Sequence, residues 1–199
     1  SRYPVRFGFC RGQQKRMPRH FRDALSTMAL KSTIYKINLN VSDMDRGYYA
    51  EHALTVARHP SENDERLMVR VLAFALHASE DLRFGRGLST EDEADLYEPD
   101  LTGAIRLWLD VGLPDERLVR KAAARAERVV VVTYGRTAVQ WWEQSKGTLA
   151  RLANLTVVRL APADTLALAG LAQRAMNLQC IVNEGQIWLG DDGAMLQPA

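Results

Sequence analysis

The stretch EADLYEPDLTGAIRLWLDVG, residues 93–112, is rich in carboxylates although its apolar pattern is typical of two strands. Two aspartates whose oxygens reach one point can bind Mg²⁺, which prefers oxygen ligands at about 2.1 Å. Asp100 and Asp110 are ten residues apart, and one extended strand would separate them by about 33 Å. The chain must therefore turn back before two of these acids can share an ion.

The best turn in this stretch is Thr102-Gly103, because glycine readily adopts a positive φ. A two-residue turn there places Tyr97 opposite Trp108 and Asp95 opposite Asp110, and opposed residues share one face of the hairpin. The aromatic pair supports this register independently. Asp95 and Asp110 are therefore the predicted metal-binding and catalytic acids. The alternative is that they are ordinary solvated acids at the edge of a sheet.

Two other acids of the hairpin need an explanation in this register. Asp100 points away from Asp110, so it is excluded from the pair. Glu98 faces Leu107 on the side that we expect to be buried, and a β-bulge near Pro99 would relieve this mismatch.

A third acid and a cation are predicted from the neighbouring helices. Glu62 lies in the expected first turn of a helix, where an acid is stabilised by the helix dipole, so its position requires no metal. Glu65 is therefore the candidate third metal ligand. Sites of this type usually carry a lysine two residues after the second acid, where this chain has Gly112. Lys121, followed by small alanines, is the candidate replacement. A solvent-exposed acid and a solvent-exposed cation are the alternative interpretations of Glu65 and Lys121.

The elements that must position these residues alternate between strands and helices. One domain with a mixed β-sheet flanked by helices, an α/β fold of the α+β kind, is the simplest architecture. In chain order we expect strands at 32–42 and 48–58, a helix within 59–79 that begins at Ser61, the hairpin, a helix at 114–128, a strand from Val129, a helix at 137–153, a strand at 155–160, a helix from Pro162, and a hairpin at 178–190.

The overall composition is that of an ordinary globular protein, with 47% apolar and 25% charged residues. No apolar run approaches the roughly 20 residues of a membrane-spanning helix, so no membrane association is expected. Cys10 and Cys180 indicate neither a disulfide framework nor a metal site, which favours a cytoplasmic location.

The basic charge is concentrated at the N-terminus. Seven of the 26 lysines and arginines but only one of the 24 acids lie in residues 1–27, so the remainder carries a net charge of −4. This segment has no helical or strand period, and regular patterning begins at Met28. We interpret residues 1–27 as an upstream extension or a cloning remnant; a basic arm that binds phosphate is the alternative.

Several segments between residues 28 and 135 resemble the YaeQ family of bacterial proteins. They are MALKSTIYK, LTVARHPSENDERLMVR, GLSTEDEADLY, IRLWLDVGLPDERLVRKA and TYG. The resemblance implies a domain spanning residues 28–199. The family pattern resembles D-E-P-D-L-W, and this chain reads DEADLY from Asp92 to Tyr97, with Ala94 and Tyr97 as departures. The resemblance agrees with the choice of Asp95.

The order of an acidic helix, a hairpin with two acids, a helix with a lysine and a buried strand also resembles the PD-(D/E)xK phosphodiesterase core. This resemblance implies a nuclease-like hydrolase dependent on Mg²⁺ or Mn²⁺, with nucleic acid as a partner and with an unknown physiological substrate. Gly112 departs from the lysine of that pattern. The net negative charge of residues 28–199 and the missing lysine favour an alternative. In that alternative the chain is a catalytically inactive module that binds a protein or a nucleic acid.

Overall fold

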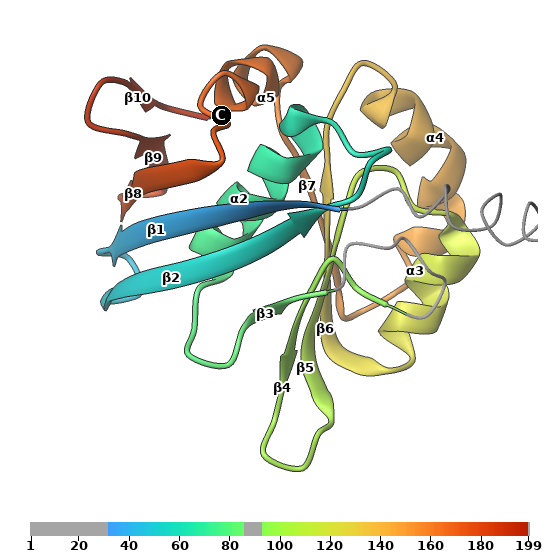
Figure 1. Cartoon of the computed structure of the whole chain (residues 1–199). Coiled ribbons are helices and arrows are strands. Elements are labelled where there is room, and N and C mark those ends of the chain that lie inside the picture. The colour runs from blue at the N-terminus through green and yellow to red at the C-terminus, as the bar shows by residue number, and fades with distance from the viewer. Residues whose placement is uncertain (1–31, 86–92, 199) are drawn as a thin grey trace, which may run out of the picture. The chain divides into compact units, whose positions relative to one another are not determined.

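The computed structural model describes residues 32–85 and 93–198, and this part of the chain is a mixed α+β domain. Its strands form two sheets of five strands each, so the prediction of one mixed sheet was wrong. Helix α2 packs between the sheets, while α3 and α4 cover the far face of the second sheet (Figure 1). The predicted order of elements is otherwise preserved.

The first sheet joins the two ends of the described chain. Strand β1 pairs with β2 in antiparallel and with β8 in parallel, and the spatial order is β10-β9-β8-β1-β2. Alternate residues of β1, including Ile37 and Leu39, are buried, as expected for a sheet covered on one face. The strands of this sheet are β1 (Thr33–Asp43), β2 (Tyr48–Arg58), β8 (Ala175–Asn183), β9 (Gln186–Gly190) and β10 (Met195–Leu196).

The second sheet carries the acidic hairpin. Its spatial order is β3-β4-β5-β6-β7, with antiparallel pairing up to β5 and parallel pairing beyond it. Strand β6 is buried over most of its length, as predicted from its apolar run. The strands of this sheet are β3 (Arg83–Phe84), β4 (Leu96–Pro99), β5 (Ile105–Val111), β6 (Ala126–Thr133) and β7 (Leu155–Arg159).

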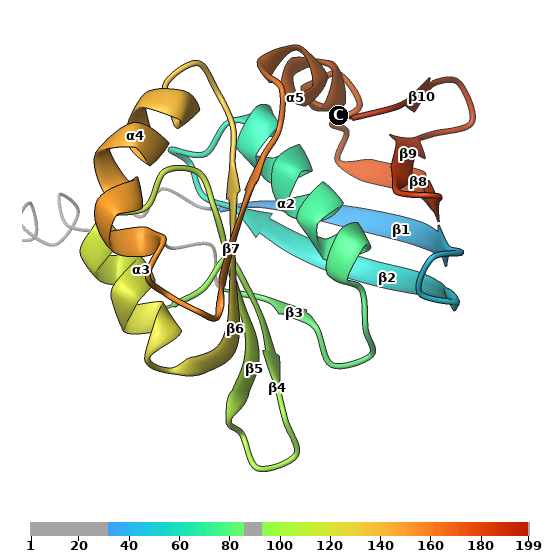
Figure 2. The ribbon, with the colours of Figure 1, turned by 180° about the vertical axis from the view of Figure 1, so that it is seen from behind.

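Helix α2 explains why two sheets form. Every residue from Leu67 to Ala75 is buried, and a helix buried all round must be covered on more than one side. Seen from behind, α2 lies in front of β1 and β2 (Figure 2). None of the described helices has both the length and the apolar character needed to cross a bilayer. The helices are α2 (Asp64–His77), α3 (Glu116–Ala123), α4 (Ala138–Leu149) and α5 (Pro162–Ala169).

Several element boundaries differ from the sequence prediction, among them the starts of α2 and β6. The N-cap of α2 is Asn63, whose side chain accepts a hydrogen bond from the Arg66 backbone N–H at 2.9 Å, whereas Ser61 was predicted to begin the helix. Asparagine satisfies an otherwise unpaired helix donor as well as serine does. Strand β6 begins at Ala126 rather than at Val129, which shortens the helix before it.

Candidate functional site

The hairpin between β4 and β5 has the predicted register where it carries the site. Tyr97 pairs with Trp108, and Glu98 pairs with Leu107. The register then shifts between Glu98 and Pro99, so the expected bulge is confirmed. The bulge accommodates Glu98, an acid on the buried side, and Pro99, which has no N–H to donate to the strand ladder.

Asp100 stabilises the hairpin turn. Its Oδ1 accepts hydrogen bonds from the backbone N–H groups of Thr102 and Ala104 at 2.7 and 2.9 Å, and from the Thr102 hydroxyl at 2.7 Å. These bonds keep the pKa of Asp100 below its ordinary value. The exclusion of Asp100 from the acid pair agrees with this structural role.

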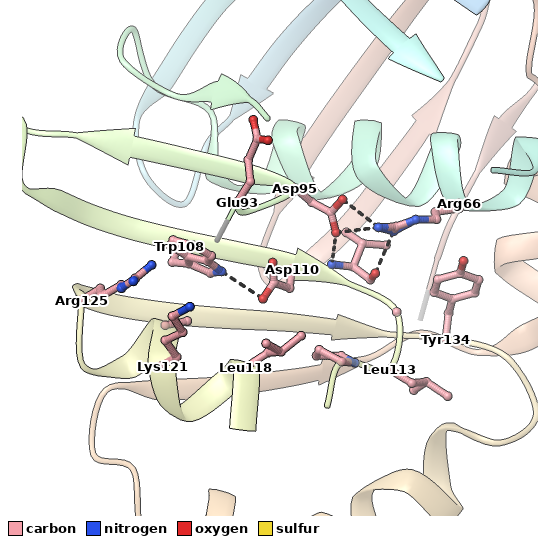
Figure 3. Close-up of a pocket in the computed structure, with 14 residues that line it drawn as sticks. Arg66, Glu93, Asp95, Trp108, Asp110, Leu113, Leu118, Lys121, Arg125 and Tyr134 are labelled. Carbon is pink, nitrogen blue, oxygen red and sulfur yellow. Dashed lines mark hydrogen bonds and ion pairs between the residues drawn. The ribbon is translucent and has the colours of Figure 1, made fainter. Parts of the chain in front are cut away.

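A pocket of about 380 Å³ opens beside the C-terminal end of β5 (Figure 3). It brings together three of the predicted site residues, Asp95, Asp110 and Lys121, with Lys121 reaching from α3 towards the strands. The pocket is lined by Arg66, Glu93, Asp95, Trp108, Asp110, Val111, Gly112, Leu113, Pro114, Leu118, Lys121, Ala122, Arg125 and Tyr134.

Asp110 is the acid whose protonation the site changes most. Its pKa is raised to about 6, chiefly by burial and in part by the neighbouring charge of Asp95. A hydrogen bond from Trp108 Nε1 to Asp110 Oδ2 at 2.9 Å and the charge of Arg66 act in the opposite direction. A carboxyl group with this pKa exchanges protons near neutral pH, and any added cation would favour its ionised form.

Asp95 is held by a helix and by the neighbouring strand. Arg66 Nη2 donates to its Oδ1 and Oδ2 at 2.8 and 3.0 Å, and the backbone N–H of Val111 donates to Oδ2 at 2.7 Å. Arg66 Nη1 also donates to the Val111 carbonyl at 2.8 Å. These bonds fix the Asp95 carboxylate at the pocket and compensate its charge.

Behind Asp95 lies a buried ionic network that the sequence interpretation missed. Arg70 is 1% exposed and pairs through Nη1 with Glu62 at 3.1 Å, while its Nε lies 3.7 Å from Asp95 Oδ1. Arg66 and Arg70 are one turn apart on one face of α2, and Glu62, which just precedes the helix, lies beside both. That spacing, and a lone arginine in an apolar run, were the available sequence signals.

Glu65, the predicted third metal ligand, lies elsewhere. It does not line the pocket, and its Oε1 accepts a hydrogen bond from the Thr165 hydroxyl at 2.6 Å. Thr165 belongs to α5, a hundred residues further along the chain, and is fully buried. The contact therefore joins α2 to α5, and the structure does not bring Glu65 together with Asp95 and Asp110.

Gly112 has a backbone conformation that a lysine would adopt only with strain. Its φ is +113°, in the region that favours glycine. Positive side chains instead reach the pocket through Lys121 and Arg125 (Figure 3). The site thus contains three carboxylates, Glu93, Asp95 and Asp110, together with several cations, a combination suited to binding and polarising an anionic ester.

Metal ligands are sparse in this pocket. Among residues 32–85 and 93–198, no three His, Cys, Asp or Glu side chains are grouped closely enough to hold an ion. Asp95 and Asp110 are the acids that could hold one, with water completing the ligand shell, as is usual for Mg²⁺. Asp92 of the family pattern and the predicted extension 1–27 lie outside the described residues.

The chain is similar to several bacterial proteins. Residues 28–198 match the family model described as YaeQ protein. The relative from Salmonella typhi, called uncharacterized protein YaeQ, is 46% identical over 165 residues, covering 82% of this chain and 91% of that protein. The protein of the same name from Escherichia coli K12 is 43% identical over 166 residues, covering 83% and 92%.

Two crystal structures of YaeQ proteins share the fold. The protein from Xanthomonas axonopodis pv. citri is 48% identical with a TM-score of 0.80, and the match covers 84% of this chain and 95% of that one. The protein from Pseudomonas syringae is 35% identical with the same TM-score, and covers 84% and 93%. The chain therefore belongs to the YaeQ family.

Proposed function

We propose that the chain is a metal-dependent hydrolase of phosphodiester bonds, of the PD-(D/E)xK type, that acts at the Asp95–Asp110 pocket. The observation that carries the proposal is Asp110, a carboxyl group whose pKa burial raises to about 6 beside a second carboxylate. Two partly buried neighbouring acids are destabilising unless a cation or a proton offsets their charge. Such arrangements are concentrated at functional sites.

The residues present fit a weakly held Mg²⁺ or Mn²⁺. Asp95 and Asp110 line the same pocket, and Mg²⁺ in phosphoryl-transfer sites is typically held by one or two carboxylates together with water and substrate phosphate. When bound, the ion would lower the pKa of a water molecule and neutralise charge on the phosphate. We assign no metal contact to Glu65, because its Oε1 is bonded to Thr165.

The side chains of the pocket have distinct roles in this proposal. Arg66 holds the Asp95 carboxylate in place through hydrogen bonds at 2.8 and 3.0 Å. Lys121 stabilises negative charge that develops on the phosphate, in place of the lysine that Gly112 replaces. Arg125 binds a non-bridging phosphate oxygen. The substrate class is a nucleic acid, because its backbone supplies phosphodiesters in an extended, accessible form.

The test is cleavage of supercoiled plasmid DNA and of a labelled single-stranded RNA in Mg²⁺, Mn²⁺ or chelator. We expect cleavage of one substrate to require the metal and to fall at least about 100-fold in Asp110→Asn, since one catalytic interaction commonly contributes that much. Lys146→Gln, on the exposed face of α4, is the matched control for Lys121→Gln. Equal cleavage by the wild type and Asp110→Asn would overturn the proposal.

A second candidate is a non-catalytic module that binds a protein or a nucleic acid. It is favoured by the pairing of Asp95 with Arg66, because the site is then charge-compensated without an ion. Calorimetric titration with Mn²⁺ separates the two candidates. The module predicts no heat of binding, whereas the hydrolase predicts binding that Asp95→Asn abolishes.

A further inference from the structure

The face of the second sheet that carries α3 and α4 has a second pocket, of about 530 Å³, between α4 and β7. Its volume is within the range of ligand-binding clefts. Trp142 and Val139 of α4 form one wall, and Val139 is 52% exposed. The lining residues are Thr133, Ala138, Val139, Trp142, Leu149, Ala150, Leu152, Leu155, Val157 and Arg159.

Strand β7 is the edge of its sheet among the described residues, beyond β6 in the spatial order. Leu160 donates its backbone N–H to Thr133 at 2.9 Å, and Asn154 accepts one from Val129 at 2.8 Å. In a parallel ladder alternate residues bond to the same neighbour, so even-numbered residues here face β6. The backbone groups of Val157 and Arg159 therefore point away from β6, towards the open edge.

This edge has few of the features that normally discourage pairing with another chain. Natural edge strands are often very short, or carry proline, lysine or a bulge. The opposite edge, β3, has only two residues. Strand β7 has five residues, LTVVR, with no proline or lysine and with two adjacent valines that are only half-buried. Apart from the charge of Arg159, β7 therefore lacks the usual obstacles to pairing with another strand.

The pocket-lining side chains and the edge-facing backbone groups of β7 lie together. Leu155, Val157 and Arg159 line the pocket. The backbone groups of Val157 and Arg159 face the edge, whereas the Leu155 N–H donates to the Leu152 carbonyl at 3.3 Å. Arg159 is the one charged residue among the pocket-lining side chains, and no ion pair joins it to any residue of the described chain. The pocket is thus apolar along its length and positively charged at one end.

We propose that the β7–α4 groove binds an extended peptide segment, which adds to β7 as a sixth strand of the sheet. One apolar side chain of the peptide enters the pocket between Val157 and Trp142. A carboxylate of the peptide, from an acidic side chain or the C-terminus, pairs with Arg159. Main-chain hydrogen bonds supply affinity and the pocket supplies selectivity, as in other cases of strand addition.

A second copy of this chain matches the groove less well. Two β7 strands paired edge to edge would bring together LTVVR with LTVVR, which contains no acid for Arg159. A small apolar molecule would fill the pocket but would leave the edge N–H and C=O groups of Val157 unused. A peptide with an acidic group satisfies the pocket, the edge and the charge together.

The test is selection of a random nonapeptide library displayed on phage against the full-length chain. We expect enrichment of proline-free sequences with apolar residues at alternate positions and an acidic residue at one end. Synthetic peptides of those sequences should lose at least tenfold in affinity with Val139→Lys, which fills the pocket from an exposed site. Arg159→Gln should reduce affinity several-fold.

Two variants isolate the contribution of the backbone. Val157→Pro removes one edge-facing N–H without removing a ladder bond to β6, and should weaken binding at least tenfold. Thr156→Ala, an exposed neighbour on the other face of β7, is the control and should bind normally.

Three results would overturn the proposal. They are the absence of enriched peptides, peptides whose affinity is equal for the wild type and Val139→Lys, and self-association that Val157→Pro abolishes. The last result would identify a second copy of the chain as the occupant of the groove. None of these measurements depends on hydrolysis at the Asp95–Asp110 pocket.

Discussion

Arg66 donates through one nitrogen, Nη2, to both carboxylate oxygens of Asp95, at 2.8 and 3.0 Å. This contact attaches α2 to the start of β4 and gives Asp95 a permanent counter-charge. Arg66 thus fixes the position of the acid and also competes with any cation for the same oxygens. The balance between these two effects determines how strongly the pocket can bind a metal.

Replacing Arg66 with glutamine should strengthen metal binding while it weakens the fold. Removal of the positive charge leaves Asp95 free to attract Mn²⁺, and we expect several-fold higher affinity by calorimetry. Loss of the partly buried ion pair should lower the free energy of unfolding by about 1–3 kcal/mol, measured with urea. Arg151→Gln, at an exposed site, should change neither quantity. An unchanged Mn²⁺ affinity in Arg66→Gln would contradict this account.

Replacing Asp110 with asparagine should change how stability depends on pH. The folded state raises the pKa of Asp110 from 3.8 to about 6, so ionisation of this group opposes folding. Wild-type stability should therefore decline as pH rises from about 4 through 6, and Asp110→Asn should lack this component. Above pH 7 the variant should be more stable by about 3 kcal/mol.

Urea unfolding at pH 4.5, 5.5 and 7.5 measures this difference directly. Asparagine retains an oxygen that accepts the hydrogen bond from Trp108 Nε1, so the substitution changes the charge with little change in geometry. An advantage of the variant that is equal at all three pH values would show that Asp110 does not have a raised pKa.

Introducing the lysine of the PD-(D/E)xK pattern at Gly112 should destabilise the protein. Its φ of +113° disfavours any side chain, so Gly112→Lys and Gly112→Ala should each cost about 1–2 kcal/mol. Gly147→Ala is the matched control, because Gly147 lies in α4 with open space around it. That substitution should stabilise by about 0.5–1 kcal/mol. Neutral behaviour of both Gly112 variants would refute the argument from strain.

Replacing Arg70 with methionine should be strongly destabilising. The change removes the closer ion-pair partner of the buried Glu62 and leaves only Arg66, 3.9 Å away, so the expected loss in urea unfolding is about 3 kcal/mol. The double variant Arg70→Met, Glu62→Leu removes both charges and should recover much of that loss. If the double variant is no more stable than the single one, packing rather than charge accounts for the effect.

The hairpin could be predicted from sequence because local features determine it. A two-residue turn at Thr102-Gly103 predicts Tyr97 opposite Trp108, and this pairing is observed. The turn itself is one residue longer than predicted, because the Asp100 N–H donates to the Ala104 carbonyl at 2.7 Å and Pro99 pairs with Ile105. The bulge was also foreseeable, because Pro99 and Glu98 both conflict with a regular ladder. These features depend on residues that are close in the chain, where periodicity and turn preferences are informative.

The division of the strands into two sheets was not predictable in the same way. The first sheet depends on the parallel pairing of β1 with β8, for example Leu39 with Leu178, which local patterns do not encode. The hydrogen bond between Glu65 and Thr165 also joins residues that are far apart in the chain. The roles of Arg66 and Arg70 follow from the same packing, because α2 lies between the sheets and aims both arginines at Asp95.

The most direct test of the central claim is an anomalous diffraction map from crystals soaked in Mn²⁺. The proposed hydrolase predicts a peak in the pocket with one oxygen of Asp95 and one of Asp110 at about 2.1 Å, by analogy with Mg²⁺. Crystals of Asp110→Asn should lack that peak. If wild-type crystals bind Mn²⁺ only elsewhere, while Arg66 still covers Asp95, the pocket is not a metal site and the catalytic proposal fails.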